Sequence, residues 1–360
     1  MNREIAAGFL GTVKDAGRRR TFAPHRGSPD GHVFADRRDG FVNRVERRDD
    51  LARDGLDAAD LLRDLFDRGR FTRGASSATV LATRRRFPIL VTQALAHPEN
   101  RTLPLTLRPN SLLKAYGVVR SALIYRANPL RRRRSRAFYG RFLGPGDLAF
   151  DIWAHLGDRV RAWRDLGARV VAVEPQPHLA AVLGRLHGRD PSVTLVRAAL
   201  GAAPGSAELL INRRNPTLST LSADWAAEVA ASPRFPGERW EERVTVEVTT
   251  LDALIELHGV PRFCKIDVEG FERAVLDGLS RPVECLSFEF IPETPDRAHA
   301  CLERLADLGT HRYNVALGEE RRLLFADWVD QAGIARWLES RRPADGSGDI
   351  YARYVPFRSS

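Results

Sequence analysis

Acidic side chains follow three apolar runs of this chain, at the points where strands would end. Asp151 lies near the end of the first run, Glu174 closes the second, and Asp267 and Glu269 follow the third. A carboxylate at such a position can accept hydrogen bonds from the ribose hydroxyls of a nucleotide-like ligand. Two acids spaced by one residue are too few for a metal site without further ligands, so we expect no metal.

The loop after Asp151 indicates which kind of nucleoside the chain would bind. It contains one well-placed glycine, Gly157, and does not fit the Gly-x-Gly-x-x-Gly pattern of dinucleotide-binding proteins. Asp151 would repel phosphate oxygens but would suit a ligand that carries a positive charge. The residues therefore favour S-adenosylmethionine, with its sulfonium and amino groups, over a nicotinamide dinucleotide.

The elements around these residues predict a parallel sheet. Strands are expected from Leu148, from Arg169 and over Val193–Leu200, with helices between them that begin near Asp158 and contain Leu179 to Leu186. This β-α-β-α-β order implies right-handed crossovers, and parallel topology brings the strand ends to one edge. The fold class expected is α/β, a doubly wound and mostly parallel Rossmann-like sheet.

The rest of the chain is expected to complete that sheet. Residues 202–250 interrupt the rhythm and are interpreted as a substrate-facing insertion, with strands near its two ends. Further strands are expected around residues 263–266 and 283–290, and Thr294-Pro295 predicts a capped helix start. Two segments, Tyr313–Leu317 and Arg322–Phe325, are expected to form a closing antiparallel pair, and a short helix is expected over Ala137–Phe142.

Composition excludes several classes of protein. The 360-residue chain has a net charge of +10, but Lys14, Lys114 and Lys265 are its only lysines, and arginine bias alone does not indicate nucleic-acid binding. Three widely spaced cysteines predict neither disulfides nor a zinc site. No apolar run is long enough to span a membrane. We expect a cytoplasmic protein with an irregular extension over residues 1–110 and one domain over residues 111–355.

Several motifs resemble the FkbM family of S-adenosylmethionine-dependent methyltransferases, some of which methylate hydroxyls of sugars and natural products. The resemblance covers about residues 115–354. The matching segments are Gly146-Asp-Leu-Ala-Phe-Asp-Ile152, Ala168-Arg-Val-Val-Ala-Val-Glu-Pro-Gln-Pro177, Ser219-Thr-Leu-Ser222, Thr249-Thr-Leu-Asp-Ala-Leu254, Lys265-Ile-Asp-Val-Glu-Gly270, Leu286-Ser-Phe-Glu-Phe290 and Ser347-Gly-Asp-Ile-Tyr-Ala-Arg353.

The resemblance implies a role for each candidate residue. The cofactor-binding residues that it implies are Asp151, Trp153, His155 and Gly157 at the methionine moiety, Glu174 and Pro175 at the ribose, and Ala198 and Ala199 at the adenine. Asp267 and Glu269 would face the transferable methyl group, where one of them orients or deprotonates a substrate hydroxyl. Lys265 would either serve the site or pair with a nearby carboxylate. The implied partner is a small molecule or glycan with a free hydroxyl.

One position departs from the family pattern. Members usually have glycine where this chain has Trp153, and that glycine allows close approach to the cofactor and a backbone conformation that is costly for other residues. An indole there would fill space meant for the methionine moiety unless it swings out. The leading hypothesis is an O-methyltransferase, and the alternative is a non-catalytic family member that serves as a binding or scaffold protein.

Overall fold

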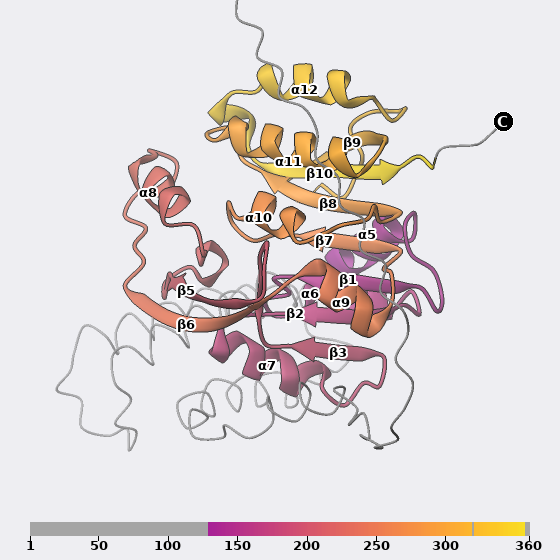
Figure 1. The fold of residues 1–360 in the computed structure, drawn as a ribbon, viewed down its shortest axis with the longest axis vertical. Coiled ribbons are helices and arrows are strands. Elements are labelled where there is room, and N and C mark those ends of the chain that lie inside the picture. The colour runs from indigo at the N-terminus through magenta and orange to yellow at the C-terminus, as the bar shows by residue number, and fades with distance from the viewer. Residues whose placement is uncertain (1–128, 319, 357–360) are drawn as a thin grey trace, which may run out of the picture. The chain divides into compact units, whose positions relative to one another are not determined.

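A seven-stranded sheet organises the part of the chain that the computed structural model describes, residues 129–318 and 320–356 (Figure 1). The extension expected over residues 1–110 lies outside these described residues. The sheet order is β3-β2-β1-β7-β8-β10-β9. The strands are β1 (Leu148–Ile152), β2 (Arg169–Val173), β3 (Val193–Val196), β7 (Phe263–Ile266), β8 (Cys285–Phe290), β9 (His311–Leu317) and β10 (Gly348–Tyr354).

The strand directions confirm the expected doubly wound α/β class. Strands β3, β2, β1, β7 and β8 pair in parallel, and only β10 runs antiparallel to its neighbours β8 and β9. The order reverses between β1 and β7, because the chain returns from the β3 side to start the other half of the sheet. Such a switch point is where doubly wound sheets bind their ligands, beyond the carboxyl ends of the strands.

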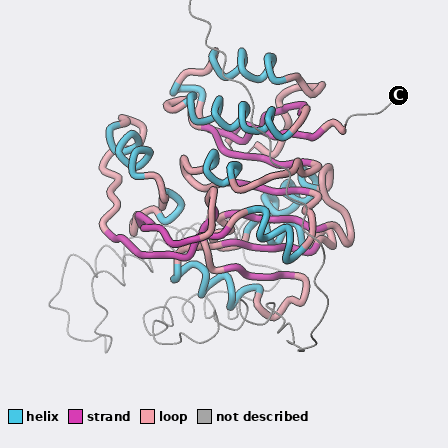
Figure 2. The backbone as a smooth tube through the Cα atoms, viewed as in Figure 1, coloured by secondary structure: helices cyan, strands magenta, loops and turns pink. Residues whose placement is uncertain are grey.

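Helices cover both faces of this sheet (Figure 2). One face carries α5 (Pro129–Tyr139), α6 (Asp158–Arg164) and α7 (Pro177–His187). The other face carries α9 (Leu251–His258), α10 (Glu272–Asp277), α11 (Pro295–Leu308) and α12 (Gln331–Glu339). Alternate residues of each strand enter the two cores, as the period of two in a strand requires. Aromatic rings fill the core beneath α5, α6 and α7, where Phe142 and Phe263 both stack on Tyr351.

The interruption at residues 202–250 forms a second, three-stranded sheet with the order β4-β6-β5. Its elements are β4 (Ala199–Leu200), β5 (Gly205–Ile211), a 3-10 turn (Pro216–Leu218), α8 (Ala223–Ala231) and β6 (Glu242–Thr249). The single strand expected over Val193–Leu200 is therefore wrong. The chain leaves the main sheet after Val196, and Ala199 pairs with Val248 of β6 instead.

Two expectations elsewhere in the chain are also wrong. Residues 322–325 form no strand, and β9 pairs along its length with β10; Leu324 is 40% exposed, whereas Ile350 and Tyr351 of β10 are fully buried, so the later run is the better sheet partner. The helix expected from Ala137 begins already at Pro129, because proline suits the first turn and arginine is a good helix former. Thr294 precedes α11 without a capping hydrogen bond from its side chain.

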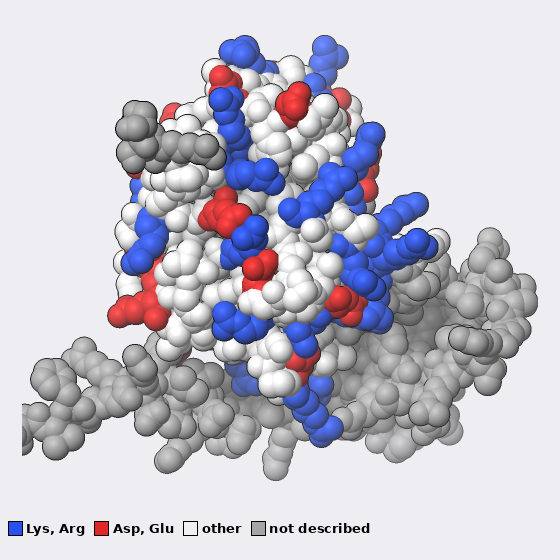
Figure 3. All heavy atoms as spheres, turned by 90° about the vertical axis from the view of Figure 1, so that its right-hand side faces the viewer, with Lys and Arg blue, Asp and Glu red and all other residues white. Residues whose placement is uncertain are grey.

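Charge and cysteine placement agree with an ordinary folded domain. On the face shown in Figure 3, basic side chains are spread among acidic and uncharged ones. Cys264, Cys285 and Cys301 are free and buried, and burial raises the pKa of each thiol. Among the described helices, each is too short or too polar to cross a lipid bilayer.

Candidate functional site

The turn from β1 into α6 is built from residues in the left-handed backbone region. Trp153 and His155 have φ angles of 72° and 53°, and Gly157 has 73°. Hydrogen bonds from the backbone N–H groups of Trp153 and Ala154 to the carbonyl of Val173 hold the turn against β2, at 2.9 and 2.8 Å. Left-handed φ costs a residue with a β-carbon on the order of 1–3 kcal/mol. The costly conformation expected at Trp153 is therefore confirmed.

A side chain at Gly157 would be strained by its positive φ and would also displace the ends of neighbouring side chains. A β-carbon at this position would lie 2.7 Å from Cδ1 of Leu183, in addition to the strain of its positive φ. The absence of a side chain lets the loop lie directly on α7 before α6 begins. The sequence expectation of a loop that ends at Gly157 and a helix that starts at Asp158 is confirmed.

Glu174 lies directly after β2 and is completely buried. Its carboxylate accepts two backbone hydrogen bonds, from the N–H of His155 at 2.8 Å and of Gln176 at 2.9 Å. Burial raises the pKa of Glu174 to about 8, although these two donors oppose that shift. A carboxylate has about four acceptor positions, so Glu174 retains capacity for ligand hydroxyls. Pro175, the next residue, is buried as well.

The insertion is fastened to both sides of the switch point by the Ser-Thr-Leu-Ser motif. The hydroxyl of Ser219 donates to the side-chain oxygen of Gln176 at 3.0 Å, beside Glu174. The hydroxyl of Thr220 donates to the carbonyl of Glu269 at 2.7 Å. Sequence reasoning singled out this motif without a role; the structure shows that it links the end of β2 to the turn after β7.

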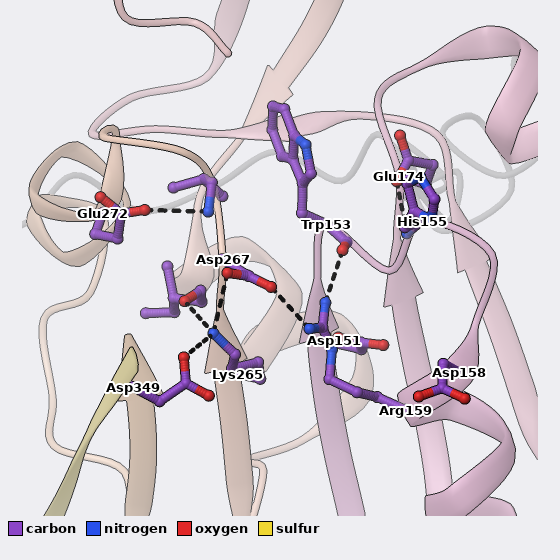
Figure 4. A network of polar contacts seen from close by, with 12 residues as sticks. Asp151, Trp153, His155, Asp158, Arg159, Glu174, Lys265, Asp267, Glu272 and Asp349 are labelled. Carbon is purple, nitrogen blue, oxygen red and sulfur yellow. Dashed lines mark hydrogen bonds and ion pairs between the residues drawn. The ribbon is translucent and has the colours of Figure 1, made fainter. Parts of the chain in front are cut away.

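Arg159 of α6 holds the two acids on either side of the switch point. Its guanidinium donates to Oδ1 of Asp151 at 2.7 Å, to Oδ2 of Asp267 at 2.7 Å and to the carbonyl of Trp153 at 3.0 Å (Figure 4). Sequence reasoning missed this residue, because one arginine among so many carries no signal of its own. The second oxygen of Asp151 is buried and has no hydrogen-bond partner among the described residues.

Lys265 extends the same ion network across the sheet. The ammonium group is 2.8 Å from Oδ1 of Asp349 on β10 and 3.2 Å from Oδ1 of Asp267, and the side chain is 2% exposed. These two carboxylates raise the pKa of Lys265 against the effect of burial. In turn, Lys265 and Arg159 lower the pKa of Asp267. Of the two alternatives left open for Lys265, pairing with nearby carboxylates is the one that the structure shows.

The Trp153 indole occupies the space beyond the end of β1. Figure 4 shows it between Glu174 on one side and Glu272 on the other. The side chain is 3% exposed, and its ring nitrogen is buried without a hydrogen-bond partner in the described part of the chain. A buried donor without an acceptor costs free energy, which adds to the backbone strain at the same residue.

The remaining candidates lie on the expected edge. Ala198 and Ala199 are buried and follow β3, whose Val196 carbonyl accepts a hydrogen bond from the N–H of Glu174. Glu269 follows β7 with a φ of 53°. Burial and the neighbouring Glu289 raise the pKa of Glu269. Sequence reasoning missed Glu289, which the register of β7 and β8 places two residues beyond Ser287, itself paired with Lys265.

The topology and the acids at the switch point define a class, a Rossmann-like methyltransferase domain. The FkbM methyltransferase domain profile matches residues 151–332, about half of the chain. The chain therefore belongs to the FkbM methyltransferase family, whose cofactor is S-adenosylmethionine. The family expected from the sequence motifs is confirmed.

Solved structures that match are distant. They include a TehB-like methyltransferase from Corynebacterium glutamicum, at 10% identity over 68% of this chain and 98% of that chain, with a TM-score of 0.36. An O-methyltransferase from Thermotoga maritima matches at 12% identity over 69% and 73%, with a TM-score of 0.33. A precorrin-6y C5,15-methyltransferase from Geobacter metallireducens matches at 15% over 62% and 87%, also at 0.33. Curated protein sequences give no match.

The described side chains fit one end of S-adenosylmethionine and not the other. Glu174 is a buried acceptor at the position that suits a ribose. At the methionine end, Arg159 already binds one oxygen of Asp151, and the Trp153 indole stands over the end of β1 (Figure 4). In this conformation the second oxygen of Asp151 is unpaired among the described residues but buried, so it does not reach an amino group outside the loop. The roles implied for Asp151, Trp153, His155 and Gly157 stay predictions.

Proposed function

We propose that this protein is an S-adenosylmethionine-dependent O-methyltransferase that acts on a hydroxyl of a sugar, glycan or other natural product. One observation supports the proposal above all: buried Glu174 directly follows β2 and Glu269 follows β7, on opposite sides of the switch point. Glu174 is suited to ribose hydroxyls, and Glu269 to an acceptor that approaches from the other half of the sheet. Bound S-adenosylmethionine would supply the methyl group.

Between the two acids after β7, we assign the substrate hydroxyl to Glu269. Both oxygens of Asp267 are engaged, one by Arg159 at 2.7 Å and one by Lys265 at 3.2 Å, and these cations lower its pKa. The Glu269 carboxylate has no ion pair among the described residues, and its pKa is raised. A carboxylate that no cation engages keeps its lone pairs available to accept a proton from a substrate hydroxyl. Asp267 then positions Arg159 and Lys265.

Trp153 sets a condition on this function. Its indole must leave the space beyond β1 before the methionine moiety can lie there, and the strained φ and unpaired ring nitrogen both favour such a change. In an in-line methyl transfer the protein mainly aligns the acceptor oxygen with the methyl group. A small movement of this turn would therefore control the reaction.

Titration of S-adenosylhomocysteine into the full chain tests the proposal, with wild type, Trp153→Gly and Trp153→Phe compared by calorimetry. We expect Trp153→Gly to bind at least about tenfold more tightly than wild type, since it removes both the indole and the strain. Trp153→Phe keeps the bulk and the β-carbon, and serves as the matched control with no gain. Absence of binding to both wild type and Trp153→Gly would falsify the proposed function.

The same titration addresses a second candidate, a family member that folds but does not catalyse. The buried indole and the engaged Asp151 favour it. This candidate predicts no binding heat for wild type and clear binding for Trp153→Gly. Methyl transfer from labelled S-adenosylmethionine to any hydroxylated acceptor by the wild type excludes it.

A further inference from the structure

A cavity of about 680 Å³ lies beside the turn after β7. Pockets of roughly 300–1,000 Å³ are typical of sites for drug-sized ligands. Its walls come from three elements, which supply Glu228 of α8, Gly270 and Glu272 at the start of α10, and Thr294, Pro295 and Arg297 at the start of α11. The residues proposed to bind the cofactor do not line it.

A narrow crevice adjoins the cavity on the side of the strand ends. It shares Gly270, Glu272 and Arg297 with the cavity, is also lined by Glu289 of β8, and has a volume of about 10 Å³, room for about one water molecule. Because β7 and β8 are parallel and Lys265 pairs with Ser287, Glu289 lies on the strand next to Asp267. Glu269 itself lines neither space, but it lies one residue before Gly270, which lines both.

The insertion and α11 are locked together along this cavity. Arg297 donates to Glu228 of α8 at 3.1 Å and to the carbonyl of Gly270 at 3.0 Å. Trp225 of α8 packs on Gly270 so closely that a β-carbon there would lie 2.3 Å from the indole. These contacts hold α8, the turn at Gly270 and α11 in fixed positions around the cavity.

The lining carries more negative than positive groups. Across the cavity and the crevice, the charged residues are Glu228, Glu272, Glu289, Glu293 and Asp296 against Arg273 and Arg297. Both arginines are engaged, Arg297 with Glu228 at 3.1 Å and Arg273 with Asp277 at 2.9 Å. Glu272, Glu289 and Asp296 have no ion pair within the described part of the chain, so an incoming ligand meets uncompensated carboxyl groups.

Among the acidic residues of the lining, Glu272 gives the strongest indication of a bound cation. It is 5% exposed and lines both the cavity and the crevice. Its Oε1 accepts from the N–H groups of Val268 and Gly270, each at 3.2 Å, while its described hydrogen bonds leave Oε2 unused. Burial raises the pKa of Glu272 to about 7. Burying a carboxylate is costly unless a cation or further donors accompany it.

We propose that this cavity is the acceptor site and that it selects a hydroxylated acceptor with a positive charge, such as an amino sugar. The inference rests on the proposed function and specifies its substrate class. The ammonium group would pair with Glu272, with Glu289 and Asp296 nearby, and the crevice would widen as the acceptor hydroxyl approaches Glu269. Charge complementarity of this kind selects among acceptors of equal size.

A binding experiment without cofactor tests the charge preference. The full chain is titrated with a β-1,4-linked glucosamine trisaccharide and with its fully N-acetylated counterpart, which has a similar backbone but no amine. We expect the amine form to bind at least about tenfold more tightly at low salt, and the preference to shrink as salt is added. Glu272→Gln keeps an oxygen for the two backbone donors and should lose most of this preference. Glu256→Gln, an exposed position on α9, is the matched control and should keep it.

Each outcome decides the inference. Equal binding of the two sugars, or binding of neither, overturns it, as does a preference that Glu272→Gln leaves intact. If Glu272→Gln unfolds at lower temperature, Asp296→Asn at the exposed start of α11 replaces it, with a smaller but measurable loss expected. The S-adenosylhomocysteine titration is separate, so a protein that binds the amine but not the nucleoside retains the acceptor site and loses the proposed function.

Discussion

Trp153 and Arg159 determine the state of the candidate site at the level of single residues. The indole is buried in a left-handed turn, and the guanidinium binds both Asp151 and Asp267. Asp151, Glu174, Asp267 and Glu269 could be found from sequence, because parallel strands bring their carboxyl ends to one edge. Arg159 could not, since its role depends on the distance between two strands that are more than 100 residues apart in the chain.

Removal of Arg159 should destabilise the domain strongly. Arg159→Met leaves the completely buried Asp151 and the half-buried Asp267 without this cation. Breaking one partner of a buried ion network costs about 3–5 kcal/mol. Arg164→Met on the same helix removes a more exposed pair with Asp190 and should cost less than about 1 kcal/mol. Chemical denaturation of both variants measures the difference, and equal losses would contradict the network described here.

Glu174 should make stability depend on pH. Its pKa is about 8 in the folded state against 4.5 ordinarily, so between these values the folded protein binds more protons than the unfolded chain. Stability then falls as pH rises from about 5 to about 8, by on the order of 4 kcal/mol. Glu174→Gln lacks this titration. The unfolding free energy of the variant minus that of the wild type should therefore increase from pH 5 to pH 8. A constant difference from pH 5 to pH 8 would argue against the raised pKa.

Among the elements, the insertion between β3 and α9 departs furthest from a plain doubly wound sheet. Its Ser-Thr-Leu-Ser motif fastens it to Gln176 and to Glu269, and α8 lies over Gly270. The two long strands and the helix of this segment follow from local pattern. The short β4, only Ala199–Leu200, does not, because two residues carry too little periodicity to show which sheet they join.

Gly270 should be intolerant of a side chain. Its φ is 84°, and a β-carbon would lie 2.3 Å from the Trp225 ring. We expect Gly270→Ala to destabilise the protein by roughly 2–5 kcal/mol, from backbone strain together with overpacking. Gly237→Ala shares the positive φ, at 77°, but meets nothing within 4 Å, and should cost about 1–2 kcal/mol. Thermal unfolding compares the two; a similar loss in both would show that the α8 contact is unimportant.

At the scale of the whole molecule, the last strand of the chain lies inside the sheet rather than at its edge. β10 lies between β8 and β9, although it follows both in sequence. The class of the fold could be predicted because alternation of strands and helices implies it. The place of β10 could not, because pairing between distant segments is set by the burial of Ile350 and Tyr351 rather than by any local signal.

A fragment of residues 111–360 should fold by itself. Both cores and the ion network lie within the described residues, and the family match lies within the same region. We expect the fragment to unfold cooperatively, with a midpoint within a few degrees of that of the full chain. Circular dichroism and calorimetry on both proteins test this domain boundary, and an unfolded fragment would place the boundary nearer the N-terminus.

The three buried cysteines can report local unfolding of the domain. Cys264, Cys285 and Cys301 lie on β7, β8 and α11, and are buried with raised thiol pKa values. Alkylating reagents attack thiolates that solvent can reach, so modification must wait until the packing around β7, β8 and α11 opens. The rate at which a maleimide modifies these thiols would therefore measure how often this part of the domain opens, with no engineered residue.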